Sequence, residues 1–244
     1  MSAEGVIEAR AIVKSFAGTR ALDTVSVTVT KGELCGIVGA DGAGKTTLLR
    51  CVAGLYQVES GSVLPGRVRR NQVGFCPQGF HLYADLTVDE NLEFFGLVYG
   101  LDKRTLAQRS EELLSFAGLA EHRSRLAGNL SGGMQQKLTL ACSVLHRPPI
   151  LLLDEPTTGV DPLSRREFWR LIEVLHTDGA TIMMASSYFD EVERCEHVVF
   201  LHEGHVLADG SVDELTRGNK SLEEAFRQLM SESETGPSNA EVTK

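Results

Sequence analysis

The feature that most constrains this chain is a glycine-rich segment that lies between an apolar run and a helix-like stretch. The apolar run covers residues 34–38, and the helix-like stretch covers residues 48–53. The segment between them fills every position of the pattern G-x-x-x-x-G-K-[ST]. Its residues are Gly39, Ala40, Asp41, Gly42, Ala43, Gly44, Lys45, Thr46 and Thr47. A strand, a glycine loop and a helix in this order predict a loop that binds phosphate groups.

The residue types in this loop fit that chemistry. Glycines allow the backbone to curl, so that successive N–H groups point inward at phosphate oxygens. The positive end of the following helix adds to the attraction. Lys45 is expected to reach the β- and γ-phosphates of a nucleotide, and the Thr46 hydroxyl is expected to bind Mg²⁺. A structural glycine turn is the alternative, but the flanking strand and helix favour the phosphate loop.

Apolar runs alternate with helix-like patterns along the rest of the chain. This order predicts an α/β fold with a parallel sheet that helices cover on both faces. Residues 54–66 are dotted with glycine and are predicted to be irregular. Strands are predicted at residues 6–13, 22–29, 73–76, 150–153, 181–185 and 198–201, and helices from residue 86 and at residues 105–117, 131–144, 162–176 and 188–194.

Composition limits the classes of protein that this chain can be. Its 244 residues suffice for one large domain or two small ones, and a net charge of −9 argues against nucleic acid as the main partner. The longest apolar runs, such as residues 150–153, are far shorter than the roughly 20 residues that span a bilayer. The first residues carry neither a basic nor an apolar stretch, so no signal peptide and a cytoplasmic location are expected.

Two further segments carry residues suited to nucleotide chemistry. Asp154 and Glu155 follow a run of four aliphatic residues, so they are expected at a strand end. There Asp154 would hold Mg²⁺ through water, and Glu155 would polarise an attacking water as general base. An exposed pair of loop carboxylates is the alternative reading. The second segment, Ser131-Gly132-Gly133, offers a helix N-cap with an open backbone, although many helix starts share that pattern.

Together these segments resemble the ATP-binding subunit of ABC transporters, across about residues 5–230. The resemblance rests on the phosphate loop, Gln78 after Pro77, the signature at residues 130–133, the Asp154-Glu155 pair and residues 158–161. It implies the P-loop ATPase fold of that family: a mostly parallel sheet, an N-terminal antiparallel β part and an inserted helical subdomain at about residues 79–145. Residues 1–230 would form this domain, and residues 231–244 are predicted to be a disordered acidic tail.

The resemblance also assigns roles to single residues. Two subunits of this family dimerise head to tail, and each ATP lies between the phosphate loop of one and the Ser131, Gly132 and Gly133 region of the other. Phe16, which by itself reads as an exposed turn residue, matches the aromatic that stacks on adenine. Gln78 matches the residue that senses the γ-phosphate and Mg²⁺ and contacts the membrane partner. Asp161 matches a loop that crosses the dimer interface.

The implied partners are an integral membrane permease and a second, identical or different ATP-binding subunit, which would place the protein on the inner face of the cell membrane. Residues 86–92, 158–162 and 221–226 resemble the exporter branch, which handles drugs, lipids or polysaccharides. Two alternatives remain: a soluble ABC protein that acts on ribosomes or DNA, and a regulatory subunit that hydrolyses little ATP. The acidic balance of the chain disfavours RNA as a partner.

Two departures from the family pattern bear on structure and activity. The chain between residues 61 and 73 is short, so a reduced edge hairpin is expected there. The family also carries a histidine after the strand that follows the Asp-Glu pair, and here Ser187 takes its place. A similar loss occurs in the first ATP-binding domain of some tandem bacterial exporter ATPases. We therefore expect good ATP binding with slow hydrolysis, unless Ser187 with a water, or Tyr188, replaces the histidine.

Overall fold

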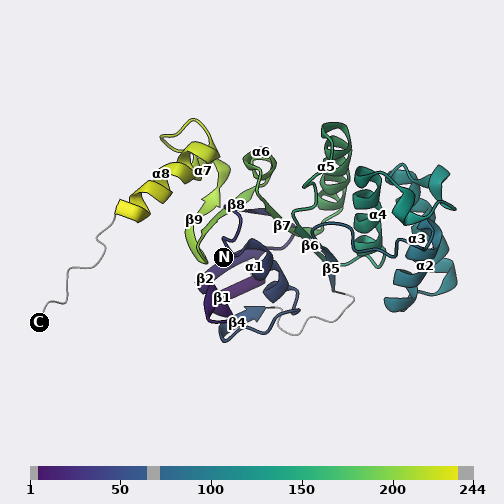
Figure 1. The fold of residues 1–244 in the computed structure, drawn as a ribbon, viewed down its shortest axis with the longest axis horizontal. Coiled ribbons are helices and arrows are strands. Elements are labelled where there is room, and N and C mark those ends of the chain that lie inside the picture. The colour runs from purple at the N-terminus through teal and green to yellow at the C-terminus, as the bar shows by residue number, and fades with distance from the viewer. Residues whose placement is uncertain (1–4, 65–71, 236–244) are drawn as a thin grey trace, which may run out of the picture.

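The computed structural model describes residues 5–64 and 72–235, which form two β-sheets with helices around them (Figure 1). The larger sheet has the strand order β5-β6-β7-β3-β8-β9. Its first five strands are parallel, and β9 runs antiparallel to β8. The strands are β3 (Leu34–Val38), β5 (Val73–Cys76), β6 (Ile150–Asp154), β7 (Thr181–Ser186), β8 (His197–His202) and β9 (His205–Ser211). The predicted α/β fold with a mostly parallel sheet is confirmed.

A smaller antiparallel sheet has the order β2-β1-β4. Its strands are β1 (Gly5–Phe16), β2 (Thr19–Thr30) and β4 (Ser60–Leu64). The prediction of irregular structure at residues 54–66 is wrong for β4, which pairs with β1. Most side chains of β4 are exposed. The strand therefore lacks the apolar alternation that would identify it in the sequence. The predicted short hairpin extends into residues 65–71, which lie outside the described part of the chain.

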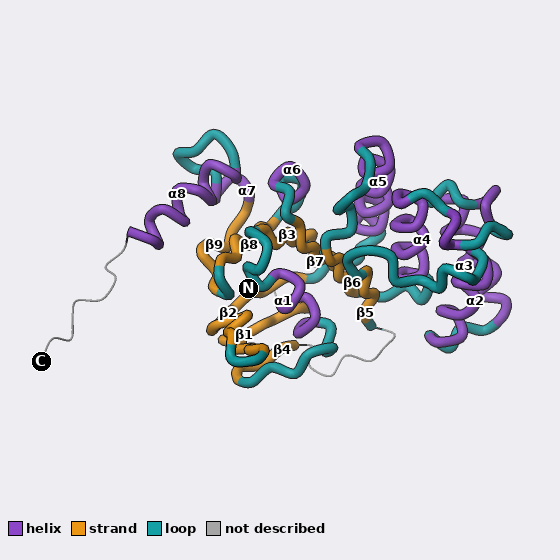
Figure 2. Tube along the Cα trace, viewed as in Figure 1, coloured by secondary structure: helices purple, strands orange, loops and turns teal. Residues whose placement is uncertain are grey.

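The helices lie around the sheets, and three of them gather at one end of the molecule (Figure 2). Helix α1 (Lys45–Val52) follows the glycine loop and packs between the two sheets. Helices α2 (Val88–Val98), α3 (Lys103–Phe116) and α4 (Gly132–Val144) gather at one end of the molecule, with short 3₁₀ turns at Ala120–His122 and Ala127–Asn129. A capping box starts α2, because Thr87 and Glu90 exchange side-chain to backbone hydrogen bonds there.

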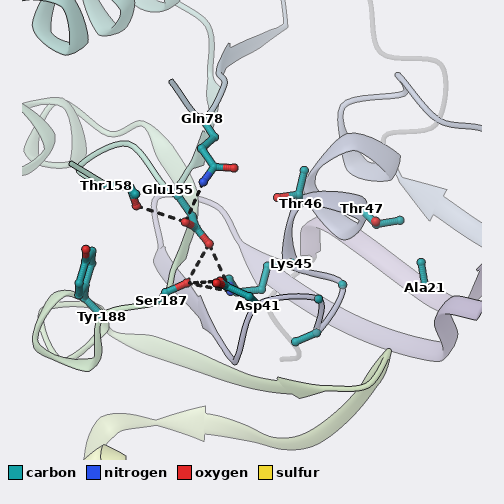
Figure 3. A pocket seen from close by; sticks show the side chains of 13 residues that line it. Ala21, Asp41, Lys45, Thr46, Thr47, Gln78, Glu155, Thr158, Ser187 and Tyr188 are labelled. Carbon is teal, nitrogen blue, oxygen red and sulfur yellow. Dashed lines mark hydrogen bonds and ion pairs between the residues drawn. The ribbon is translucent and has the colours of Figure 1, made fainter. Parts of the chain in front are cut away.

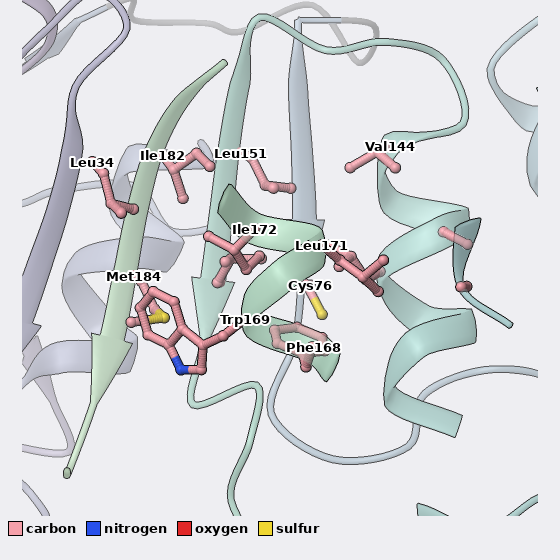
Figure 4. Packing of buried hydrophobic residues seen from close by; sticks show 14 of the residues in the cluster. Leu34, Cys76, Val144, Leu151, Phe168, Trp169, Leu171, Ile172, Ile182 and Met184 are labelled. Atoms are coloured by element: carbon pink, nitrogen blue, oxygen red, sulfur yellow. The ribbon is translucent and has the colours of Figure 1, made fainter. Parts of the chain in front are cut away.

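The core has two layers because consecutive residues of the parallel strands point to opposite faces. On one face, Cys35 and Ile37 of β3 pack with α1 and the smaller sheet. On the other, Leu34 belongs to the cluster that includes residues of α4 and of α5 (Pro162–Thr177), and Trp169 of α5 lies near Met184 (Figure 4). Strands that are buried on both faces read as continuous apolar runs, which is why the sequence identifies them.

The C-terminal part begins after α6 (Phe189–Val192) and β8–β9, with α7 (Val212–Leu215) and α8 (Leu222–Thr235). The prediction of disorder from residue 231 is wrong for residues 231–235, which continue α8. Hydrogen bonds within the helix, such as that from Gln228 to Glu232 at 2.8 Å, support this last turn. Residues 236–244 lie outside the described chain. Within the described ranges, no helix is long and apolar enough to cross a membrane.

Candidate functional site

Most of the residues predicted to bind the phosphates or to act in hydrolysis line a cavity of about 640 Å³ at the carboxyl edge of the parallel strands (Figure 3). Loops that follow β3, β5, β6 and β7 each supply part of its wall, as expected where parallel strands end together. Nine of the residues predicted from sequence line the cavity: Asp41, Gly42, Ala43, Gly44, Lys45, Thr46, Thr47, Gln78 and Glu155. Gly39, Ala40 and Asp154 lie next to these residues in the chain or touch them.

Two glycines of the loop are required by close backbone contacts. A Cβ atom on Gly39 would lie 2.0 Å from the Leu201 carbonyl oxygen. One on Gly44 would lie 2.5 Å from the Ala21 carbonyl oxygen, and Gly44 has a φ of +107°. Neither position accepts a side chain without displacing backbone. The loop is therefore held against β2 and β8 in one curled shape, with α1 starting at its end.

Lys45 is the buried cation of the site, with 4% of its surface exposed. Its Nζ donates hydrogen bonds to the Gly39 carbonyl at 2.7 Å and to the Ser187 hydroxyl at 3.0 Å. The same atom lies 3.3 Å from Oε1 of Glu155 in an ion pair. The ammonium group is thus fixed between the glycine loop and the carboxylate, where it would face bound phosphate groups.

The pair Thr46 and Asp154 fits the requirements of a magnesium site. The Thr46 hydroxyl donates to Oδ1 of Asp154 at 2.8 Å. The other carboxylate oxygen, Oδ2, is buried and has no hydrogen-bond partner among the described residues. Burial raises the pKa of Asp154, against the Thr46 hydrogen bond, which lowers it. Hydroxyl and carboxylate oxygens are ligands that Mg²⁺ prefers, and an unpaired buried oxygen is costly without a cation or water.

Glu155 is held by groups from four segments and is 8% exposed. Its carboxylate accepts hydrogen bonds from Gln78 Nε2 at 3.1 Å, from Thr158 Oγ1 at 3.2 Å and from Ser187 Oγ at 2.9 Å, in addition to the Lys45 ion pair. Its backbone has a φ of +44°, in the left-handed region that non-glycine residues rarely adopt. Such strain persists where surrounding contacts over-determine the conformation, often at functional sites.

Ser187 lies at the centre of the cavity wall, between the cation and the carboxylate. Besides its contacts with Lys45 and Glu155, its hydroxyl lies 3.4 Å from Oδ1 of Asp41. A hydroxyl has one proton to donate, so the nearer Glu155 is its main acceptor. Tyr188 also lines the cavity, and the guanidinium of Arg165 lies 4.5 Å from its ring centre.

Sequence reasoning missed two residues of the wall, Ala21 and Thr158. Ala21 lies on β2, far from any motif, and no sequence signal marks it. Thr158 belongs to a segment that the family resemblance had already singled out, and its hydroxyl supports Glu155. Its position three residues after Glu155 is the signal that would have identified it.

Several predicted residues are not among the described residues that line this cavity. Phe16 is 42% exposed and packs edge-on against Tyr56, with ring centres 5.2 Å apart. Asp161 caps α5, where Oδ1 accepts from the backbone N–H of Ser164 at 3.0 Å. Ser131 caps α4 through the N–H of Met134. The roles that the resemblance gives these residues, across a dimer interface, stay predictions.

The two signature glycines differ in what surrounds them. A Cβ atom on Gly133 would lie 2.4 Å from Cβ and Oγ of Ser164, so glycine is needed there for α4 to pack on α5. A Cβ atom on Gly132 would have no described atom within 4 Å. Packing therefore accounts for Gly133, whereas Gly132 leaves an open backbone at the start of α4 that another molecule could approach.

Known proteins resemble this chain in both sequence and fold. The family described as ABC transporter matches residues 22–158. The probable multidrug ABC transporter ATP-binding protein YbhF of Escherichia coli is 38% identical over 243 residues, which cover 93% of this chain and 42% of YbhF. The chain thus spans less than half the length of that relative. Nod factor export ATP-binding protein I of Burkholderia lata is 37% identical, with 84% of this chain and 70% of that protein covered.

A solved structure extends the likeness to three dimensions. It is a dimeric ATP-binding cassette in a post-hydrolysis state, bound to ADP and Pi. Its TM-score is 0.78 at 25% sequence identity, and the match covers 84% of this chain and 98% of the cassette.

Proposed function

Because the chain belongs to the ABC transporter family, we propose that it binds ATP with Mg²⁺ in the cavity beside Lys45 and hydrolyses it to drive export across a membrane. One observation carries the proposal: the buried ammonium of Lys45, the Thr46–Asp154 pair and the Glu155 carboxylate meet at one strand edge. A phosphate loop, an oxygen pair for a cation and a candidate general base are the parts that phosphoryl transfer to water needs.

Each residue has a distinct task in this reaction. The glycine loop and Lys45 bind the β- and γ-phosphates, and Thr46 and Asp154 would hold Mg²⁺, which neutralises charge on the phosphates when bound. Glu155 accepts a proton from the attacking water. Gln78 donates to Glu155 at 3.1 Å and so orients that carboxylate. In this proposal it also senses the γ-phosphate and Mg²⁺ and contacts the permease.

The transport role follows from relatives that are export or multidrug ATP-binding proteins by name. We propose that the chain works as a head-to-tail dimer on a membrane permease, exporting a drug, lipid or polysaccharide. The open backbone at Gly132 and the Asp161 turn would complete the partner's ATP site. A ribosome-associated ABC protein is the alternative. Co-expression with candidate permeases, followed by purification from membranes, separates the two: association with ribosomes and not with a permease would refute the transport role.

Ser187 favours a second, narrower proposal, namely that this site hydrolyses ATP slowly by itself. Its short neutral side chain contacts Glu155 and Lys45, where the family has a histidine that reaches the γ-phosphate. Ground-state binding, which depends on the glycine loop, would be preserved. Such a subunit would work best opposite a second ATPase subunit that retains the histidine.

The binding proposal is tested by Lys45→Ala, which removes the main cation at the phosphates. We expect affinity for a fluorescent ATP analogue to be largely lost. Lys31→Ala serves as a matched control, because Lys31 is exposed on a turn outside the cavity and its loss changes the net charge equally. Equal affinities in wild type and Lys45→Ala would show that nucleotide does not bind at the glycine loop.

A further inference from the structure

A second polar cluster lies beside the cavity, around the carboxylate of Glu191 on α6. Glu191 is 1% exposed. Its Oε1 accepts hydrogen bonds from Thr157 Oγ1, from Arg165 Nε at 2.6 Å and from Trp169 Nε1 at 3.3 Å. Its Oε2 accepts from Ser186 Oγ at 2.6 Å. One buried carboxylate therefore joins α6, α5, the end of β7 and the loop that follows β6.

Two of these donors lie next to the residues proposed to act in hydrolysis. Thr157 is two residues beyond Glu155, whose left-handed backbone needs external support. Ser186 immediately precedes Ser187, and its hydroxyl also accepts a hydrogen bond from the Tyr188 N–H at 3.0 Å. Glu191 thus contacts two of the segments that hold the Glu155 carboxylate: the loop that carries Glu155 itself, through Thr157, and the segment that carries Ser187, through Ser186.

Arg165 strengthens the link to the segment after β7. Its Nε donates to Glu191, and its Nη2 lies 2.9 and 3.1 Å from the two carboxylate oxygens of Asp190, while the guanidinium lies over the Tyr188 ring. Because the guanidinium is planar and rigid, two of its nitrogens hold two neighbouring carboxylates in a fixed orientation. Arg165 lies in α5, one turn beyond the Asp161 cap, so the cluster also ties the start of α5 to the cavity.

Stability is a poor explanation for this cluster. A buried ion pair costs desolvation energy that its attraction barely repays, and well-packed apolar residues often serve as well or better. Apolar packing is available here, since Phe168 and Ile172 of the same helix are fully buried in the core. What the carboxylate offers beyond packing is a fixed geometry, because it accepts from donors on separate segments at once.

We propose that Glu191 is a positioning residue for ATP hydrolysis, holding the Glu155 segment through Thr157 and the Ser187 segment through Ser186. This inference rests on the proposed ATPase function. It differs from a structural role in its expected kinetics. Misplacing the general base slows the chemical step, whereas the phosphate contacts of Lys45 and the glycine loop, which do not touch the cluster, keep their affinity for ATP.

The test is Glu191→Gln, which keeps the shape of the side chain but replaces one acceptor oxygen with an NH₂ donor. We expect a fall in kcat of about tenfold, with the Kd for ATP changed by less than about threefold. kcat is measured by steady-state hydrolysis at saturating ATP, and single-turnover hydrolysis with protein in excess over radiolabelled ATP isolates the chemical step. The Kd comes from fluorescent-nucleotide titration, and melting temperature is recorded for every variant.

Glu167→Gln is the matched control, because it makes the same chemical change on α5 at an ion pair with Lys137 (2.9 Å) that does not reach the cavity loops. We expect its kcat to equal that of the wild type. Thr157→Val and Ser186→Ala each remove one donor with little change of shape, and each should lower kcat by part of the Glu191→Gln effect. They decide the question if Glu191→Gln does not fold.

Two results would overturn the inference, and they are distinguishable. A lowered melting temperature with wild-type kcat in Glu191→Gln, or in both single-donor variants, would make the cluster purely structural and leave the ATPase proposal intact. A wild-type protein that binds ATP but never hydrolyses it, alone or with a partner subunit, would overturn the proposed hydrolysis and this inference with it.

Discussion

At the scale of single residues, contacts in the cavity converge on the Glu155 carboxylate. The carboxylate is contacted by Gln78 after β5, Thr158 after β6, Ser187 after β7 and Lys45 at the start of α1. The sequence predicts that Lys45 and Glu155 each belong to the site, because each stands in a motif of known spacing. It does not predict that the two side chains lie 3.3 Å apart in an ion pair, since that distance depends on the register of β3, β7 and β6.

Glu155→Gln is expected to separate binding from chemistry. The amide keeps the size of the side chain but cannot accept a proton from water, so turnover should fall by ~10²-fold or more while ATP still binds. Trapped ATP should also hold two subunits together, which gel filtration with and without ATP would detect. Normal steady-state turnover in this variant would remove Glu155 from the mechanism.

Ser187→His is expected to speed hydrolysis. One preorganised donor to the transition state is typically worth about 10²–10³ in rate, so restoring a histidine should raise kcat substantially, with little change in ATP affinity. Ser187→Ala is the companion variant: if the hydroxyl helps to hold Glu155, kcat should fall further. Steady-state ATPase rates and nucleotide titrations are measured in parallel.

The outcome that contradicts this expectation is equally clear. If purified wild type alone already turns over at ~1 s⁻¹ or faster, within the usual range for enzymes, and histidine adds nothing, Ser187 is an adequate replacement. The proposal of a slow site that relies on a second subunit would then be wrong.

At the scale of elements, sequence patterns identify helices and strands that bury an apolar face, and they miss elements that are stabilised by backbone pairing or by polar contacts. β6 was predictable because both of its faces are apolar, and α2 because Thr87 and Glu90 form a capping box. β4 was not, because its stability comes from backbone pairing with β1 rather than from an apolar face. The Glu191 cluster was also beyond prediction, since its donors meet only after α5 and α6 pack together.

The signature glycines at the start of α4 give a prediction about one element. Gly133→Ala should destabilise the protein by about 1–3 kcal/mol, because its methyl group would overlap Ser164 at 2.4 Å. Gly132→Ala should leave stability unchanged or slightly raised, since its methyl group has open space and alanine favours helix. If Gly132 faces ATP on a second subunit, the variant should nonetheless lose cooperative ATPase activity.

Urea denaturation and ATPase assays of both variants test this division. Ser164→Gly, combined with Gly133→Ala, should recover part of the lost stability because it removes the overlapping atoms. Equal stability of the two single variants would contradict the packing explanation for Gly133. Full ATPase activity in Gly132→Ala would contradict its role at a dimer interface.

At the scale of the whole molecule, the cavity lies at one edge of the parallel sheet and the helices α2–α4 gather at one end (Figure 1). The motif residues divide accordingly: the glycine loop, Gln78 and Glu155 line the cavity, whereas Ser131 and Asp161 cap helices at the starts of α4 and α5. The sequence predicts that both sets matter, and among the described residues only the first set lines the cavity. In the proposed dimer, the second set would act on the ATP of the other chain.

A last prediction for the whole molecule concerns how its stability depends on pH. His146, beside α4, stacks on Tyr99 with ring centres 3.7 Å apart. Burial lowers the pKa of His146 to about 4, against a smaller effect of the Val73 backbone that raises it. An unfolded histidine titrates near 6.5. Between these values the unfolded chain binds a proton that the folded chain does not, so the stability of the fold falls as the pH drops from about 6.5 toward 4.

The comparison with His146→Phe isolates this effect, because phenylalanine keeps the stack on Tyr99 but cannot be protonated. A shift of this size would be worth roughly 3 kcal/mol if the ring were fully buried. Because the ring is only half-buried, solvent screening reduces the expected loss to about 1 kcal/mol. His197 acts in the opposite sense, since the Asp209 hydrogen bond raises its pKa and favours the fold at lower pH, but it contributes equally to both proteins. The urea midpoint is measured for wild type and for His146→Phe at pH 7 and pH 5. Between these pH values the wild-type midpoint should fall by more than that of the variant. An equal fall in both proteins would show that His146 is not responsible.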